Sequence, residues 1–145
     1  MAVTITPYNH TARLFADGTN NESDTYKVKL YTAATFDATD TTLAEADTGS
    51  TETTAGTGYT AGGQALANVS VATVTTNDAA FDADDVVWTA SGGSIDASYA
   101  ILYNDTNADD APIAFIDFDG AQSAGDTTDF KIIWDANGIF TFTVT

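Results

Sequence analysis

The 145-residue sequence contains no cysteine, so disulfide bonds, thiolate metal sites and a cysteine nucleophile are excluded. It has no apolar run close to the roughly 20 residues that a transmembrane helix needs. Its first ten residues, MAVTITPYNH, lack the basic and apolar segments of a secretory signal. We therefore expect no membrane partner.

Basic residues are also scarce. The chain has 4 Lys and Arg against 21 Asp and Glu, which gives a formal net charge of −17. This charge repels a phosphate backbone, so we expect no nucleic-acid partner. It favours basic partners or a surface surrounded by cations. Nearly all the acids are Asp, which suits turns and loops better than helices.

Short runs of β-branched and aromatic residues, separated by turn signals, recur along the chain. They predict about eight or nine strands with little or no helix. The expected fold class is all-β, a two-layer antiparallel β-sandwich of jelly-roll-like or Ig-like type. A chain of this length buries roughly two thirds of its unfolded surface, so we expect a single β-sandwich domain over residues 1–145.

The stretch 84–105 is the predicted centre of this domain. Two apolar runs, Val86–Thr89 and Tyr99–Tyr103, flank a Ser-Gly-Gly-Ser sequence, which predicts two strands joined by a loop. Trp88 and the aromatic residues of the second run supply large apolar side chains for a core.

Further strands are predicted on both sides of this centre. In Thr25–Thr32, Tyr26 and its alternate neighbours face one way, while Lys27 and Lys29 share an exposed face. Pro112–Phe118 is apolar on both faces, as in a central strand. The other predicted strands are Thr11–Ala16, Leu66–Thr76, Asp129–Asp135 and Ile139–Val144, the last two forming a hairpin around Asn137-Gly138, with 77–85 as a turn region.

Two segments do not follow the strand pattern. Residues 1–10 carry Pro7 and suit an N-terminal arm or an edge strand. Residues 33–65 form a long Thr/Ala/Gly-rich loop in which Thr41–Ala46 favours one helical turn. Glycines around Tyr59 indicate a specified backbone path, so we expect this loop to order against a neighbouring subunit.

Catalytic patterns are weak. His10 is the single histidine and no G-x-S-x-G elbow is present, which argues against a hydrolase triad. The pairs Asp82/Asp84 and Asp117/Asp119 have the chemistry of a glycosidase, but the same spacing is typical of a solvated strand end. The sequence therefore predicts no catalytic residue, no cofactor and no enzymatic activity.

One loop partly matches a calcium site. Asp105, Asn107 and Asp109 place oxygen ligands at the first, third and fifth positions of an EF-hand-like loop. The match ends there, because Asp110 stands at the position of the glycine and Ile116 at that of the final glutamate. We therefore predict no metal site. These three residues are the candidate ligands if the loop binds calcium, and the alternative is a plain acidic turn.

The chain resembles a family of small virion proteins of tailed bacteriophages, the capsid decoration or cement proteins. The resemblance extends from Tyr8 to about Phe142. It is carried by the Tyr-Asn-His-Thr start at Tyr8 and by the segments DTYKVKLYTAATFDATDTTLAEA, GTGYTAGGQALANVSV and VVWTASGGSIDASYAILYND.

The resemblance implies a β-sandwich-like virion protein on the outer capsid surface, where it bridges neighbouring subunits of the major capsid protein. It also implies a homo-oligomer, often a trimer, and offers no catalytic motif to carry over. The arm, the long loop and the basic strand residues are then the candidates for capsid or subunit contact: Tyr8, Arg13, Lys27, Lys29 and Tyr59.

The alternative is a receptor- or carbohydrate-binding module on a head fibre or tail. Such a module exposes Trp or Tyr side chains on which sugars stack. Trp88 and Trp134 fall at core-facing positions by periodicity, which counts against it.

Overall fold

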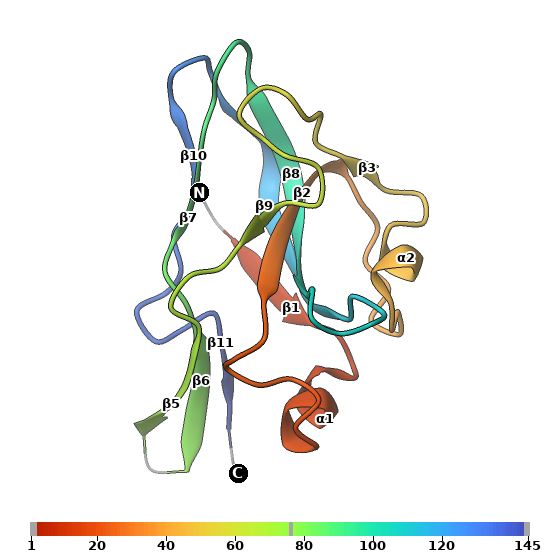
Figure 1. Ribbon diagram of the computed structural model, residues 1–145, viewed down its shortest axis with the longest axis vertical. Helices are drawn as coiled ribbons and strands as arrows, with labels where there is room; N and C mark the ends of the chain where they lie inside the picture. The colour runs from red at the N-terminus through yellow and green to blue at the C-terminus, as the bar shows by residue number, and fades with distance from the viewer. Residues whose placement is uncertain (1–2, 76, 144–145) are drawn as a thin grey trace.

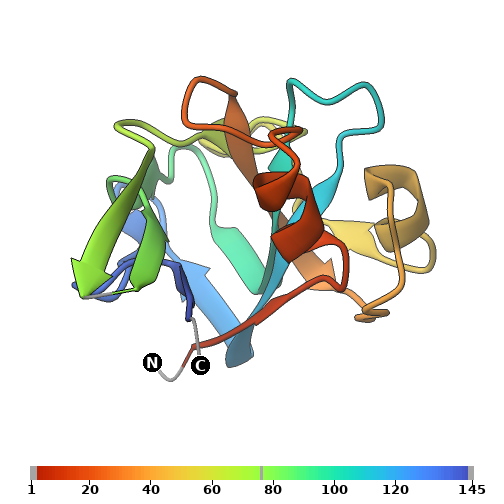
Figure 2. The ribbon, with the colours of Figure 1, turned by 90° about the horizontal axis from the view of Figure 1, so that it is seen from below.

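The computed structural model describes residues 3–75 and 77–143 and shows an all-β sandwich of antiparallel sheets packed in layers (Figures 1 and 2). The expected fold class is therefore confirmed. Within the described residues, helix is confined to the short segments α1 (Thr11–Ala16) and α2 (Leu43–Ala46).

The first layer is a six-stranded sheet. Its strand order is β1-β9-β8-β2-β3, and β4 also pairs with β2. The second half of β8 and the first half of β9, which pair with each other, are buried. This confirms the central strand that we predicted at Pro112–Phe118 from its apolar residues on both faces. The strands are β1 (Thr4–Pro7), β9 (Pro112–Ala124), β8 (Ile95–Asn104), β2 (Tyr26–Ala33), β3 (Thr51–Glu52) and β4 (Gln64–Ala65).

The second layer consists of two smaller sheets. One has the order β11-β6-β5 and the other pairs β10 with β7. In Figure 2, the light-green strands β5 and β6 lie on the left, apart from the red β1 and orange β2 of the first layer. The strands are β5 (Ser70–Thr75), β6 (Asp78–Asp82), β7 (Val86–Thr89), β10 (Asp129–Ile132) and β11 (Phe140–Phe142).

The main core lies between these layers. Tyr26 of β2 is fully buried, its ring centroid 5.0 Å from that of Phe81 in β6. Trp88 and Trp134 are 4% and 8% exposed, so their predicted core-facing positions are confirmed. Each such side chain contributes about 1.5–3 kcal/mol by leaving water. Phe81 comes from β6, a strand in the region that we predicted to be only a turn.

The prediction of a strand at 11–16 is wrong, because the segment forms α1. A six-residue run is short enough to fit both the two-residue period of a strand and the 3.6-residue period of a helix. Ala, Arg and Leu are strong helix formers, which favours the helix. The helix is fixed where Thr11 Oγ1 donates to the Ile113 carbonyl at 2.6 Å. It buries Leu14 and turns Phe15 toward the core.

The two strands of the predicted centre form, but they do not pair with each other. Trp88 of β7 lies opposite Phe130 of β10. Strand β8 pairs instead with β2 and β9 of the other layer. The segment between β7 and β8 therefore crosses from one layer to the other.

The predicted C-terminal hairpin is also wrong. Asn137-Gly138 does form the turn, with Gly138 at φ +103° and its N–H donating to the Asp135 carbonyl at 2.9 Å. However, β10 pairs with β7 and β11 pairs with β6. The turn thus moves the chain between sheets. Val144 and Thr76, which end two of the predicted strands, lie outside the described residues.

Residues 33–65 are more ordered than the predicted loop. The helical turn is confirmed as α2, which begins with a capping box in which Thr42 and Glu45 bind each other's backbone N–H groups. The segment then adds β3 and β4 to the edge of the first sheet. It therefore orders against its own sheet. Residues 4–7 form the edge strand β1, paired with β9.

Two glycines allow this segment to pass close to strands. A Cβ at Gly63 would overlap the carbonyl oxygen of Val28 in β2, and one at Gly58 would overlap that of Thr89 in β7. Both glycines have positive φ angles. The glycines around Tyr59 thus specify the backbone path, as the sequence indicated.

Replacement of Gly63 by alanine is expected to destabilise the fold more than Gly56→Ala. Gly56 also has a positive φ, but a Cβ there meets nothing within 4 Å. The left-handed backbone alone costs about 1–2 kcal/mol, and the overlap at Gly63 adds at least about 2 kcal/mol. Urea denaturation measures both free energies of unfolding. Equal losses would contradict the close approach to Val28.

Candidate functional site

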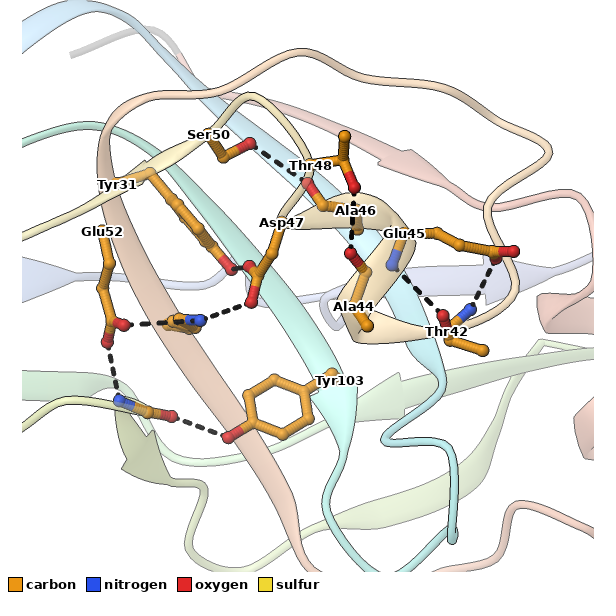
Figure 3. A network of polar contacts seen from close by, with 12 residues as sticks. Tyr31, Thr42, Ala44, Glu45, Ala46, Asp47, Thr48, Ser50, Glu52 and Tyr103 are labelled. Atoms are coloured by element: carbon orange, nitrogen blue, oxygen red, sulfur yellow. Dashed lines mark hydrogen bonds and ion pairs between the residues drawn. The ribbon is translucent and has the colours of Figure 1, made fainter.

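The most connected polar site is on the outer face of β2, the face that carries Lys27, Lys29 and Tyr31. We call it the Lys29 cluster; Figure 3 labels four of its members, Tyr31, Asp47, Glu52 and Tyr103. Its members are Lys29, Tyr31, Asp47, Glu52, Tyr59 and Tyr103.

Lys29 is the centre of this cluster. Its Nζ lies 2.8 Å from Asp47 Oδ2 and 3.4 Å from Glu52 Oε2, and its side chain is only 10% exposed. The same Nζ lies 5.3 Å from the centroid of the Tyr31 ring, within reach of a cation–π interaction. Tyr31 in turn donates its hydroxyl proton to Asp47 Oδ1. A lysine of β2 thus binds two acids of the 33–65 segment.

Glu52 extends the cluster toward β4. Its Oε1 accepts from the Tyr59 hydroxyl at 2.9 Å and from the Gly62 N–H at 2.6 Å. The Tyr59 oxygen also accepts from the Leu30 N–H of β2 at 3.1 Å. Tyr103 of β8 donates to the Gly62 carbonyl at 2.7 Å. These bonds fasten the whole 33–65 segment to the first sheet.

The tyrosines of the cluster stay protonated at neutral pH. Burial is the main cause that raises the pKa of Tyr31, Tyr59 and Tyr103 far above the ordinary value. The neighbouring carboxylates of Asp47 and Glu52 raise the pKa of Tyr31 further, because a second negative charge is unfavourable there. The phenols therefore act as hydrogen-bond donors. The cluster holds the 33–65 segment against the first sheet.

Three of the predicted contact residues need correction. Tyr8, Lys29 and Tyr59 are 2%, 8% and 2% exposed, because each packs inside the chain's own fold. They are therefore not surface contacts in this conformation. The expectation that Lys29 lies on an exposed face is wrong, since the 33–65 segment covers it. Arg13 is exposed on α1 and binds Asp17 at 2.9 Å; it stays a predicted contact.

Lys27 lies at the candidate calcium loop. Its Nζ is 2.9 Å from Asp105 Oδ2, so that carboxylate already has a cation. Asn107 Oδ1 accepts the backbone N–H of Asp109 at 3.0 Å. Across residues 3–75 and 77–143, no group of three or more His, Cys, Asp or Glu side chains is placed to hold a metal ion. The loop is built as a hydrogen-bonded acidic turn.

One carboxylate of each acidic pair, together with His10, is held by a hydrogen bond of the fold. Asp117 Oδ1 accepts the N–H of Asp119, and Asp84 Oδ2 accepts from Asn68 Nδ2. His10 Nε2 binds the Pro112 carbonyl at 2.6 Å. These bonds hold the side chains at the surface of separate elements and give them local structural roles.

A second feature is an open groove, which the sequence did not reveal. It has a volume of about 680 Å³ and lies between α1, β5 and β11. We call it the α1 groove. Phe15 of α1 and Phe142 of β11 contact each other in it, with ring centroids 5.3 Å apart. It is lined by Ala12, Phe15, Ala16, Asn20, Asn21, Glu22, Ser23, Val71 and Phe142.

A smaller apolar notch of about 330 Å³ lies beside β1. It is lined by Val3, Ile5, Ile133, Trp134 and Asp135, and Ile133 is 71% exposed. Periodicity predicts which side of a strand is apolar, but it does not show where a core remains open at the end of a sandwich. Neither opening could therefore be predicted from the sequence.

Comparison of the chain with protein-family models, with curated proteins and with solved structures finds no match. Neither of the described helices has the length and apolar character needed to span a membrane.

Replacement of Lys29 by methionine is expected to destabilise the protein by about 2–3 kcal/mol. Removal of one partner from a fully buried ion pair costs about 3–5 kcal/mol. The loss is smaller here because the Asp47 and Glu52 side chains are 35% and 26% exposed. The control is Lys131→Met, whose partner Asp129 is 38% exposed and whose loss costs within about 1 kcal/mol. Equal effects in urea denaturation would contradict the role of Lys29.

The fold is expected to be lost cooperatively above about pH 10. Burial raises the pKa of Tyr8, Tyr26, Tyr31, Tyr59 and Tyr103, whereas the unfolded chain keeps the ordinary value near 10. The stability they contribute is complete below that pH and is lost as the pH rises. Tyrosinate absorbance and circular dichroism should change together. Ionisation of these residues near pH 10 with the fold intact would contradict this.

Proposed function

We propose that this protein is a structural protein of a tailed-bacteriophage virion, a decoration protein that binds the outer capsid surface and bridges neighbouring capsid subunits. The observation that carries the proposal is the combination of a strongly acidic β-sandwich with apolar openings at its surface. The resemblance of residues 8–142 to phage decoration proteins narrows this binding role to the capsid.

The geometry favours binding over catalysis. Of the acids weighed for catalysis, Asp117 accepts a backbone N–H and Asp84 accepts from Asn68, so both carboxylates hold local structure. Apolar side chains, in contrast, line the α1 groove and the notch beside β1. Contact through such openings requires a rigid frame, which the Lys29 cluster supplies on the other face of the first sheet.

The mechanism is mass action. A protein that binds assembled capsid subunits but not dissociated ones stabilises the assembled shell, and the stabilisation grows with its concentration over Kd. The partners in this proposal are the major capsid protein and further copies of the chain in a homo-oligomer, often a trimer.

The alternative, a carbohydrate-binding module of a head fibre or tail, receives less support. Trp88 and Trp134 are almost fully buried, and Trp134 also donates its Nε1–H to the Asp84 carbonyl at 3.0 Å. Neither ring offers a face on which a sugar stacks.

The test uses heads of the phage that encodes this chain, assembled without it. The purified protein is expected to co-sediment with these heads at a saturating number of copies and to raise the temperature at which they release DNA. Heads that already carry the protein are the control and should bind no more. Absence of saturable binding, or cleavage of a polysaccharide by the protein, would contradict the proposal.

A further inference from the structure

The α1 groove is open because α1 covers only part of the sandwich end. Figure 1 shows α1 at the lower end of the molecule, near β6 and β11. One side of the Phe15 ring packs on Tyr26 and Phe81, at centroid distances of 6.3 Å and 5.4 Å. Phe15 and Phe142 nevertheless remain partly exposed at the groove. An apolar side chain of a partner would complete this packing.

The polar lining adds one charged group that selects a ligand. Glu22 is exposed, and its Oε1 accepts the N–H of Val71 in β5 at 2.6 Å, which holds the carboxylate beside the groove. Asn20 is 2% exposed, its Oδ1 accepts from Asn104 Nδ2 at 2.7 Å, and its Nδ2 is buried as well. The Glu22 carboxylate is therefore the charged group that a ligand meets at the groove.

The charge of the chain decides which partner fits. Two copies that meet at this groove bring together two molecules of formal net charge −17, each with Glu22 at the contact. Arg13, the basic residue of α1, is already paired with Asp17. A second copy is therefore disfavoured, and a basic segment of another protein is attracted.

We propose that the α1 groove binds an extended protein segment in which an apolar side chain is flanked by Lys or Arg. The apolar side chain packs between Phe15 and Phe142, and the cation pairs with Glu22. This inference goes beyond the proposed place on a phage head and stands without it, because it is carried by the lining of the groove.

The test is a nuclear magnetic resonance titration of the full-length 15N-labelled protein with the peptide Gly-Ser-Lys-Phe-Lys-Ser-Gly. Saturable shifts are expected at the amides that line the groove. Two matched peptides, one with Ala in place of Phe and one with Glu in place of both Lys, should bind at least about tenfold more weakly. Added salt should weaken binding of the first peptide, because the Glu22 contact is screened.

Two variants locate the contact, each with a matched control. Glu22→Gln keeps an acceptor for the Val71 N–H and removes the charge, so affinity should fall by about three- to tenfold. Asp126→Asn is its control, since Asp126 is an exposed carboxylate that accepts the Gly92 N–H in the same way.

Ala12→Leu fills the groove from α1 and should abolish binding. Its control is Ala44→Leu on the exposed side of α2, which should leave affinity unchanged. The amide spectra of all four variants show whether each remains folded.

Several outcomes would overturn the inference. These are the lack of saturable shifts at the groove, equal affinity for the Glu-containing peptide, and binding that survives Ala12→Leu in a folded protein. A dimer in light scattering that Ala12→Leu dissociates would assign the groove to a second copy instead. The titration contains no capsid, so its failure is distinct from a failure of the capsid-binding test.

Discussion

The structure depends on the ion pairs of Lys29 with Asp47 and Glu52. Lys29 stands on a strand of the central sheet, and a lysine buried there without a partner would be strongly unfavourable. Both carboxylates come from the 33–65 segment, with Nζ–O distances of 2.8 Å and 3.4 Å. The segment that buries Lys29 therefore also supplies the two carboxylates that offset the cost of burying its charge.

The other features of this face follow from that path. The capped helix α2 presents Asp47 to the lysine, and β3 presents Glu52. Gly63 lets the returning chain lie against β2 without a side chain in the way. The α1 groove and the notch beside β1 lie away from this covered face, at the end of the sandwich and beside the edge strand β1.

Local sequence patterns correctly predicted local structure. The alternation in β2 predicted that Tyr26 faces the core, and the helix formers around Leu43 predicted the helical turn α2. Alternation also separated Lys29 from the inward face, but it carries no information about a distant segment that covers the other face. Asn137-Gly138 likewise specified a turn and not the partners of its flanking strands, because each strand pairs with residues about 40 positions away or more.

The site was less predictable than the fold. The α1 groove is lined by residues of three separate elements, and no window of sequence contains α1, β5 and β11 together. The burial of Tyr8 and Tyr59 was missed for the same reason, since their covering residues are distant in sequence. The acidic composition, in contrast, needs no structure, and it alone favours a basic partner.

The central claim is that the 33–65 segment is a fixed part of the first layer. Native-state hydrogen exchange tests it most directly, through the N–H of Thr53, which donates to Leu30 at 2.9 Å, and that of Gly62, which donates to Glu52. We expect protection of both amides comparable with that of β8 and β9. Exchange of both amides orders of magnitude faster than in β8, in a protein that remains folded, would contradict it.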